Sequence, residues 1–234
     1  MAVLPASAIS VFHFDTDLND ALGNATVTNG GATLSTTQKK IGAKSLYFDG
    51  TTSTGNYLDI LLNLSTTYTI GFWVYSMSTP TAGWFPALFS TRKSGDGFDP
   101  GEYVYPCFGT SDFTLCGVEW NQGVGSAMSR NAWHHIAFTR SGSTRKCYLD
   151  GVLNVTLTSG TTPTALNNLC IGCLITSNDS INGNSYFKGY IDEVLVTNDV
   201  LWTANFTPPT DAYVTHNRRK FFIGQLNNQL FGGV

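Results

Sequence analysis

Short runs in which apolar and polar residues alternate recur through the chain, and glycine, proline, asparagine and aspartate separate them. A half-buried strand has this period of two because successive side chains point to opposite faces of the sheet. The run Tyr68–Tyr75, for example, places Tyr68, Ile70, Phe72 and Val74 on one face. Because no segment keeps a helical period over three turns, the pattern predicts an all-β fold.

Further runs of this kind extend over most of the chain. Those that we expect to form strands are Ile9–Asp15, Ser45–Asp49, Tyr68–Tyr75, Ala87–Thr91, Glu102–Phe108, Thr114–Trp120, His134–Arg140, Arg145–Leu149, Val152–Leu157, Leu169–Leu174 and Lys188–Thr197. The dipeptides Asp49-Gly50 and Asp150-Gly151 are typical of tight hairpin turns. A short helix is predicted only at Val200–Asn205, before Pro208-Pro209. Strands at this spacing predict a jelly-roll β-sandwich of two packed antiparallel sheets.

The chain of 234 residues fits one large sandwich, with no internal repeat and no linker. We assign residues 1–210 to the sandwich and residues 211–234 to a C-terminal arm, because the arm mixes basic, aromatic and apolar residues without a clean period. The basic-aromatic cluster of the arm comprises Arg218, Arg219, Lys220, Phe221 and Phe222. It predicts docking on an acidic neighbouring subunit, and the alternative is a solvated strand.

Charge and hydropathy exclude several classes of protein. Net charge is −3 and only 12% of residues are charged, so we expect no nucleic-acid ligand. The first residues lack a basic segment and Pro5 interrupts their apolar run, so we expect no secretory signal. No apolar stretch is long enough to insert into a membrane. A surface with so few charges fits a protein that lives inside an assembly.

Four motifs follow one another in an order and spacing that resemble a known family. They are Phe12–Asp17, then Ser45–Gly50, then Trp133–Arg140 followed by Cys147–Gly151, and finally Phe187–Val194. Together they resemble the laminin G-like branch of the concanavalin A-like sandwich over residues 9–210. The resemblance implies the jelly roll, but it leaves function open because this fold hosts lectins, enzymes and structural modules.

The segment Leu201–Pro209 is similar to the close of laminin G-like domains in bacteriophage virion proteins. This resemblance implies a non-catalytic structural protein of a virion, assembled in the host cytoplasm. Such a protein would decorate or cement the capsid, or form part of the tail, as a homo-oligomer bound to other virion proteins. The alternative is a lectin-like adhesin that binds cell-surface glycans, and a more remote alternative is a glycan hydrolase.

The acidic residues argue against catalysis. Glucanases of this fold use a Glu-x-Asp-x-x-Glu strand, which places the acids on one face. The three glutamates of the chain, Glu102, Glu119 and Glu193, do not form this pattern. Asp192 and Glu193 are adjacent, so we expect their side chains on opposite faces of a strand. We therefore expect no catalytic residues and no enzyme.

The resemblance to this family also implies a calcium ion between the N-terminal strand and the penultimate strand. The carboxylates at the matching positions are Asp15 or Asp17 and Asp192, with Asp49 as a further candidate. Oxygen ligands of this kind suit Ca²⁺. The alternative is that these side chains cap turns and bond to the backbone.

Aromatic residues in or near long glycine-rich loops are candidates for contacts with a glycan or a partner protein. They are Trp84, Phe98, Tyr103 and Trp120. Loops on a rigid scaffold often carry function. The alternative is that these side chains pack in the core or at a subunit interface.

Cysteine and histidine do not form a recognisable metal motif. Cys170 and Cys173 make a lone Cys-x-x-Cys, whereas a structural zinc site needs four ligands. The other cysteines have irregular spacing and are Cys107, Cys116 and Cys147. We interpret the cysteines as buried small side chains in strands. His134 and His135 should face opposite sides of a strand, so they do not form a metal pair.

Overall fold

The computed structural model describes residues 2–51, 56–77, 86–91, 103–108, 113–117, 124–158, 166–174 and 186–214. For 103–108, 113–117, 124–127 and 166 only the backbone is described. Within these ranges the regular structure consists of β-strands, and no helix in them is long and apolar enough to cross a membrane.

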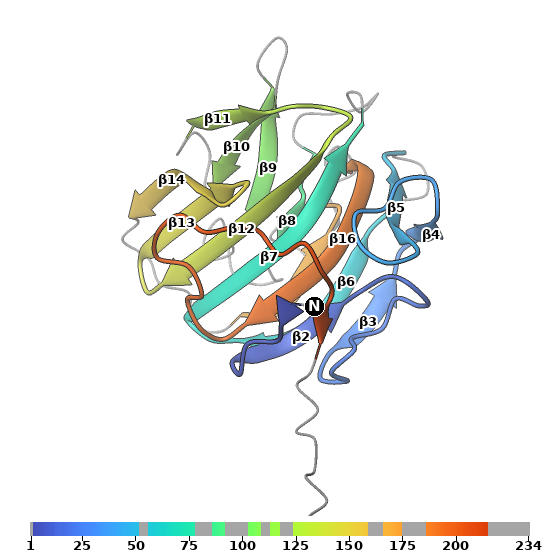
Figure 1. Cartoon of the computed structure of the whole chain (residues 1–234), viewed down its shortest axis with the longest axis horizontal. Coiled ribbons are helices and arrows are strands. Elements are labelled where there is room, and N and C mark those ends of the chain that lie inside the picture. Colours follow the sequence, from blue (N-terminus) through green and yellow to red (C-terminus); the bar gives the residue numbers. More distant parts are fainter. Residues whose placement is uncertain are drawn as a thin grey trace, which may run out of the picture.

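Two antiparallel sheets form the two layers of a sandwich (Figure 1). In spatial order, the strands of the eight-stranded sheet are β14 (Val152–Thr158), β13 (Thr144–Leu149), β12 (Trp133–Ser141), β7 (Thr67–Ser76), β16 (Lys188–Thr197), β5 (Ser45–Asp49) and β4 (Thr33–Ser35), with β2 (Ala8–Phe12) also paired to β16. Those of the seven-stranded sheet are β11 (Val124–Met128), β10 (Phe113–Gly117), β9 (Tyr103–Phe108), β8 (Phe89–Ser90), β15 (Leu166–Ile171), β6 (Leu58–Leu64) and β3 (Thr26–Asn29).

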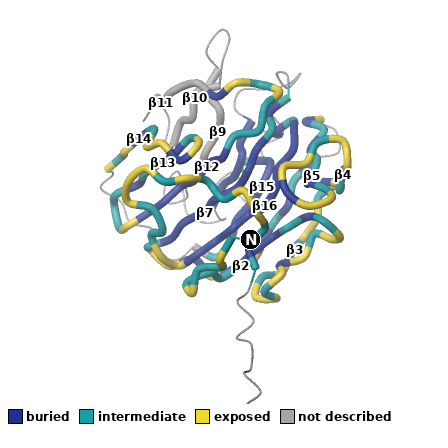
Figure 2. The backbone as a smooth tube through the Cα atoms, in the orientation of Figure 1, coloured by how far each residue is buried: buried dark blue, intermediate teal, exposed yellow. Residues whose placement is uncertain are grey.

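The main core lies between these two sheets. Alternate residues of β7, among them Ile70, Phe72 and Val74, point into it, as the sequence predicts. From the opposite layer β6 contributes Ile60 and Leu62. Figure 2 shows the central strands buried and the turns around them exposed. The predicted all-β jelly-roll sandwich is thereby confirmed.

A third, two-stranded sheet joins the two ends of the described chain. β1 (Ala2–Val3) and β17 (Tyr213–Val214) pair in parallel. A small apolar cluster that includes Val11, Leu195 and Tyr213 packs nearby. β17 lies inside the range that the sequence assigns to the arm, and residues 215–234 lie outside the described ranges.

The predicted helix at Val200–Asn205 is wrong. The segment is irregular because its backbone bonds to the sheet instead of to itself. Leu201 N donates to Thr69 Oγ1 at 3.0 Å. Phe206 N donates to the carbonyl of Gly151 at 2.8 Å.

Aromatic side chains of this segment cover part of the outer face of the eight-stranded sheet. The rings of Trp202 and Phe206 stack with centroids 4.1 Å apart, and both contact the imidazole of His135. A Cβ at Gly71 would lie 3.3 Å from the Trp202 ring, so the glycine leaves room for the indole. Tyr148 Oη donates to the Trp202 carbonyl at 3.0 Å. The segment is thus a fixed cover over one half of this face.

One of the two predicted hairpin turns is present. Asp150 and Gly151, with φ of 51° and 78°, join the paired strands β13 and β14. Two consecutive residues with positive φ are what a tight hairpin turn of this type requires. The prediction for Asp49-Gly50 is wrong, because β5 and β6 belong to different sheets and do not pair. Here Gly50, with φ of 72°, turns the chain from one layer to the other.

We predict that Gly151→Ala destabilises the protein far more than Gly142→Ala. Both glycines have positive φ, but an added Cβ at Gly151 would lie 1.9 Å from the Phe206 carbonyl oxygen, whereas Gly142 has no atom within 4 Å. Gly142→Ala should cost about 1–2 kcal/mol, the cost of a left-handed conformation. Gly151→Ala should cost at least about 2 kcal/mol more, as overpacking does. Chemical denaturation of both variants measures the difference, and equal losses would contradict the close packing at Gly151.

Candidate functional site

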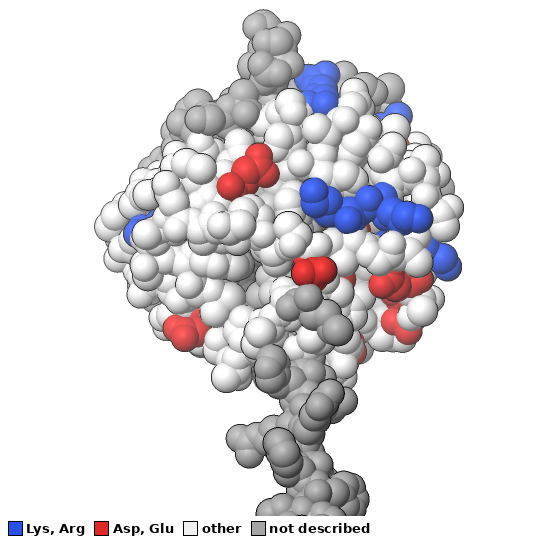
Figure 3. Space-filling view, viewed as in Figure 1, with Lys and Arg blue, Asp and Glu red and all other residues white. Residues whose placement is uncertain are grey.

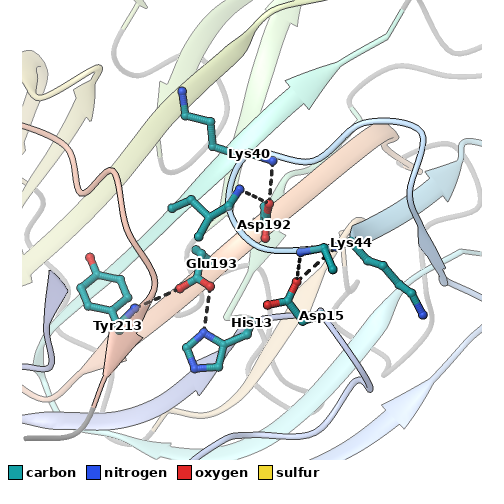
Figure 4. Close-up of polar contacts among 9 residues, drawn as sticks. His13, Asp15, Lys40, Lys44, Asp192, Glu193 and Tyr213 are labelled. Carbon is teal, nitrogen blue, oxygen red and sulfur yellow. Dashed lines mark hydrogen bonds and ion pairs between the residues drawn. The ribbon is translucent and has the colours of Figure 1, made fainter. Parts of the chain in front are cut away.

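A β-bulge in β16 brings two acidic side chains onto the same face of the sheet. Between Asp192 and Leu195 the strand has one residue more than its partner β7, and Glu193 has φ of 50°. Ile191 and Val194 both belong to the main core, so the two acids between them lie on the outer face (Figure 4). The expectation that Asp192 and Glu193 point to opposite faces is therefore wrong, because the extra residue of a bulge breaks the period of two.

Asp192 holds the loop between β4 and β5. Its Oδ2 accepts hydrogen bonds from Lys40 N at 2.8 Å and Ile41 N at 3.0 Å (Figure 4). The side chain is fully buried, and Oδ1 has no hydrogen-bond partner among the described residues. Burial raises the pKa of Asp192 to about 7, although the two backbone N–H groups favour the charged form.

Asp15 holds the same loop from the end of β2. Its Oδ1 accepts hydrogen bonds from Ala43 N and from Lys44 N (Figure 4). Gly42 lies between these donors with φ of 70°, and a Cβ there would lie 2.2 Å from the Asp15 carboxylate. Asp15 and Asp192 therefore clamp residues 40–44 through the backbone.

Glu193 connects the first strands of the chain with the last. Its Oε1 lies 2.8 Å from His13 Nδ1, and its Oε2 accepts a hydrogen bond from Tyr213 N at 3.3 Å. The Glu193 side chain is 1% exposed and that of His13 30% exposed. The hydrogen bond to Glu193 raises the pKa of His13, against the opposing effect of burial. These contacts fasten β17 and the end of β2 to the bulge.

The carboxylates that the family resemblance suggests for calcium accept hydrogen bonds from backbone N–H groups. Asp15 and Asp192 already accept two backbone N–H groups each. Asp17 and Asp49 each accept a backbone N–H from the turn that follows them, at 2.8 Å. Nowhere in the described ranges do three Asp, Glu, His or Cys side chains come together as metal ligands. Because Ca²⁺ also takes backbone carbonyl oxygens as ligands, the calcium site stays a prediction.

The two neighbouring histidines have different surroundings. His134 Nδ1 lies 2.7 Å from an Asp150 carboxylate oxygen, and its Nε2 lies 2.8 Å from Ser129 Oγ. His135 is 1% exposed and lies against the ring of Trp73 at 5.2 Å. Burial lowers the pKa of His135 to about 3, so this imidazole is neutral near neutral pH and serves as an aromatic packing group.

A row of four aromatic side chains crosses the outer face of the eight-stranded sheet. In strand order it runs Tyr47, Tyr190, Tyr75 and Trp133, and each residue is the register partner of the next. Successive ring centroids are 4.9, 5.9 and 5.7 Å apart. The residues lie on strands β5, β16, β7 and β12, which are distant in sequence. We call these four residues the aromatic row.

Three of the four residues of the aromatic row are more exposed than the residues beside them on the sheet. In the neighbouring row, Trp73 is 6% exposed and His135 1% exposed. In the aromatic row only Tyr190 is buried, and the other three side chains are half-buried. The outer face therefore presents three half-buried aromatic side chains, with the buried Tyr190 between Tyr47 and Tyr75, next to the part that the segment after β16 covers.

The cysteines behave as the sequence predicts where they are described. Cys147, Cys170 and Cys173 are free and buried. The sulfur atoms of Cys170 and Cys173 lie 2.7 Å apart, in a small cluster with Tyr57 and Tyr186. Burial raises the pKa of the Cys170 thiol, which opposes thiolate chemistry. Cys107 and Cys116 lie on strands whose side chains are outside the described part.

Several predicted site residues lie outside the described residues and stay predictions. For Tyr103 only the backbone, in β9, is described. The others are Trp84, Phe98, Trp120, Glu102, Glu119, Arg218, Arg219, Lys220, Phe221 and Phe222.

Comparison with known proteins gives one family match. A family model described as the concanavalin A-like lectin/glucanases superfamily matches residues 49–205, which is more than half of the chain. No curated protein sequence matches the chain.

Solved structures share the fold at low sequence identity. Domain 4 of AbnA, an extracellular arabinanase from Geobacillus stearothermophilus solved with arabinotriose, is 21% identical and aligns with a TM-score of 0.57 over 84% of this chain and 94% of that one. The receptor-binding domain of botulinum neurotoxin type G is 13% identical, with a TM-score of 0.56 over 84% and 49% of the two chains. Trypanosoma rangeli sialidase, solved with 2,3-difluorosialic acid, is 11% identical, with a TM-score of 0.62 over 86% and 32%. The chain thus spans about half of the neurotoxin domain and a third of the sialidase.

We predict that Asp192→Asn makes the stability of the protein less dependent on pH. The folded pKa of about 7 lies above the ordinary value of 3.8, so between these values the folded state keeps a proton that the unfolded chain has lost. Stability should therefore fall as pH rises from about 4 to about 7, by at most about 1.4 kcal/mol per pH unit from this group. Asn cannot titrate and should remove this fall.

Urea denaturation at a series of pH values from 4 to 8 measures the effect. Asp17→Asn, which removes a carboxylate from an exposed turn, is the matched control. Parallel pH profiles for the wild type and Asp192→Asn would contradict the protonation of Asp192 in the folded protein.

Proposed function

Since the chain belongs to the concanavalin A-like lectin/glucanase superfamily, we propose that it is a non-catalytic protein that binds a glycan on the outer face of its eight-stranded sheet. The aromatic row carries the proposal. The C–H groups of a sugar ring form an apolar surface that packs on aromatic rings, while phenol and indole groups hydrogen-bond to hydroxyls. Several such rings in line suit an extended oligosaccharide better than a single small molecule.

The structural neighbours support a glycan as the class of ligand. Domain 4 of AbnA was solved with arabinotriose, and the Trypanosoma rangeli sialidase with a sialic acid derivative. At 21% and 11% identity, the similarity of these two proteins to this chain is evidence of a shared fold alone. For this chain, the sugars bound by these two neighbours favour a glycan over the other ligands that aromatic surfaces bind.

The surroundings of the two bulge acids favour binding over catalysis. Hydrolysis of a glycosidic bond needs two carboxyl groups that flank the substrate. Asp192 is fully buried, and Glu193 uses both oxygens for His13 and Tyr213. Incubation with glycans that the protein binds should therefore release no new reducing ends.

We predict that Trp133→Ala and Tyr47→Ala each weaken glycan binding at least tenfold. Tryptophan and tyrosine are enriched among the interface residues whose truncation costs about 2 kcal/mol or more, which is about thirtyfold in affinity. A glycan array followed by isothermal titration calorimetry with the best oligosaccharide measures the change.

Leu61→Ala is the control for this experiment. Leu61 is 56% exposed and lies on β6 in the opposite sheet, so its truncation should leave affinity unchanged. Melting temperatures of all variants separate loss of binding from loss of the fold. An array without signal for the wild-type protein would contradict the proposal.

A virion structural role is the second candidate, and it rests on the similarity of Leu201–Pro209 to the close of phage virion domains. In this chain the aromatic residues of that segment pack on the outer face of the eight-stranded sheet. The protein would then decorate or cement a capsid, or belong to a tail, as a homo-oligomer. A glycan-binding face on a particle would serve attachment to cells, so the two candidates are compatible.

We predict that replacing Arg218, Arg219 and Lys220 by alanine weakens binding to assembled particles at least tenfold and leaves glycan binding unchanged. The loss follows if these charges dock the arm on an acidic neighbouring subunit. Co-sedimentation with purified particles measures the binding, and Lys146→Ala is the control for removal of a surface lysine. Absence of the wild-type protein from particles would contradict the virion role.

A further inference from the structure

Positive charge is concentrated beside the aromatic row. Figure 3 shows basic side chains gathered on this face of the molecule. The loop between β4 and β5 carries Lys39, Lys40 and Lys44, of which Lys39 and Lys40 are exposed and Lys44 is half-buried. In a chain with 12% charged residues, a cluster of this kind is a distinctive part of the described surface.

Lys40 lies against the residue that neighbours the row. Its Nζ is 4.0 Å from the centroid of the Trp73 ring. The indole itself is fixed, because its Nε1 donates to the Pro209 carbonyl at 3.0 Å and its ring packs on His135. Trp73 and Tyr75 are two residues apart on β7, so they share a face at a spacing of about 7 Å. The ammonium group of Lys40 therefore lies close enough to the aromatic row for a single sugar residue to contact both.

The loop backbone is fixed independently of its lysines. Asp192 accepts the N–H groups of Lys40 and Ile41, and Asp15 accepts those of Ala43 and Lys44. Neither clamp uses a lysine side chain, so the ammonium groups are free of intramolecular ion pairs with these acids. A positive charge on a pre-ordered loop binds an anion at a lower entropic cost than one on a mobile loop.

A second lysine lies at the other side of the row. Lys188 is two residues before Tyr190 on β16 and thus shares its face. Its register partner is Asp49, which accepts hydrogen bonds from the N and Oγ1 of Thr51. Because the negative charge of Asp49 offsets part of the charge of Lys188, we expect Lys40 to attract an anion at the aromatic row more strongly than Lys188 does.

We propose that the aromatic row selects negatively charged sugars, with the anionic group of a uronate or a sulfated residue bound by the ammonium group of Lys40. The proposal rests on the proposed glycan binding and names the class of glycan. In this complex a sugar ring packs on the aromatic row, and its anionic group lies beside Trp73. Both a carboxylate and a sulfate group can bind the ammonium group in this way, and the experiment below compares the two.

Matched pairs of oligosaccharides test the proposal. One pair is an oligogalacturonate and its methyl ester, and the other is a sulfated galactan oligosaccharide and its desulfated form. We expect the wild-type protein to bind at least one charged member at least tenfold more tightly than its neutral counterpart. Lys40→Gln should remove at least fivefold of this preference without changing the affinity for the neutral member, and Lys40→Arg should retain it.

Lys146→Gln is the control, because Lys146 lies on β13 and its Nζ donates to the Thr203 carbonyl. Binding of the charged member should also weaken with salt, and less steeply for Lys40→Gln. Equal affinity for the members of each pair, or a preference that Lys40→Gln leaves intact, overturns the inference but spares glycan binding. If the wild type binds no member of either pair, and the glycan array is also empty, both proposals are wrong.

Discussion

The extra residue in β16 is the constraint on which the outer half of the molecule depends. Along one edge of this strand, pairing with β5 ends at Ile191 and pairing with β2 begins at Val194. The bulge lies at this junction and keeps apolar residues facing the core on both sides of it. As a result Asp192 and Glu193 both face outward, at the point along β16 where the end of β2 lies next to the start of β5. Without the bulge, one of the two carboxylates would face the core.

Both carboxylates act as organisers of the backbone. Asp192, with Asp15, orders a basic loop, whereas Glu193 ties His13 to the strand that precedes the C-terminal segment. Buried acids are stabilised by N–H donors, and here Oδ2 of Asp192 and both oxygens of Glu193 have such partners. The outer face is thereby divided into a half covered by aromatic residues of the chain itself and a half in which the aromatic row is accessible.

Local patterns predict much of the sandwich from the sequence. The alternation in Tyr68–Tyr75 gives the correct buried face, and Asp150-Gly151 gives the correct hairpin. The strand Leu58–Leu64 escapes prediction because Leu61, on its exposed face, interrupts the alternation. Similarly, Val200–Asn205 has a helical composition locally, but bonds to Thr69 and other sheet residues determine its course.

The candidate site is much harder to predict than the fold, because its parts are brought together by pairing between distant strands. Tyr47, Tyr75, Trp133 and Tyr190 become neighbours only once strand order and register are known. The bulge has a similar origin, since no feature of the pair Asp192-Glu193 indicates an extra residue. The family resemblance points to Asp15 and Asp192, but the sequence does not predict the backbone N–H groups that these carboxylates bind.

The parallel pairing of β1 with β17 has a mechanical consequence. The pair is held by hydrogen bonds from Ala2 N to the Ala212 carbonyl at 3.1 Å and from Leu4 N to the Val214 carbonyl at 3.2 Å. In a parallel pair, tension applied between the incoming end of one strand and the outgoing end of the other acts along the strands. Such a force shears these bonds simultaneously instead of unzipping them in turn, so the sandwich behind them is shielded until the whole pair gives way.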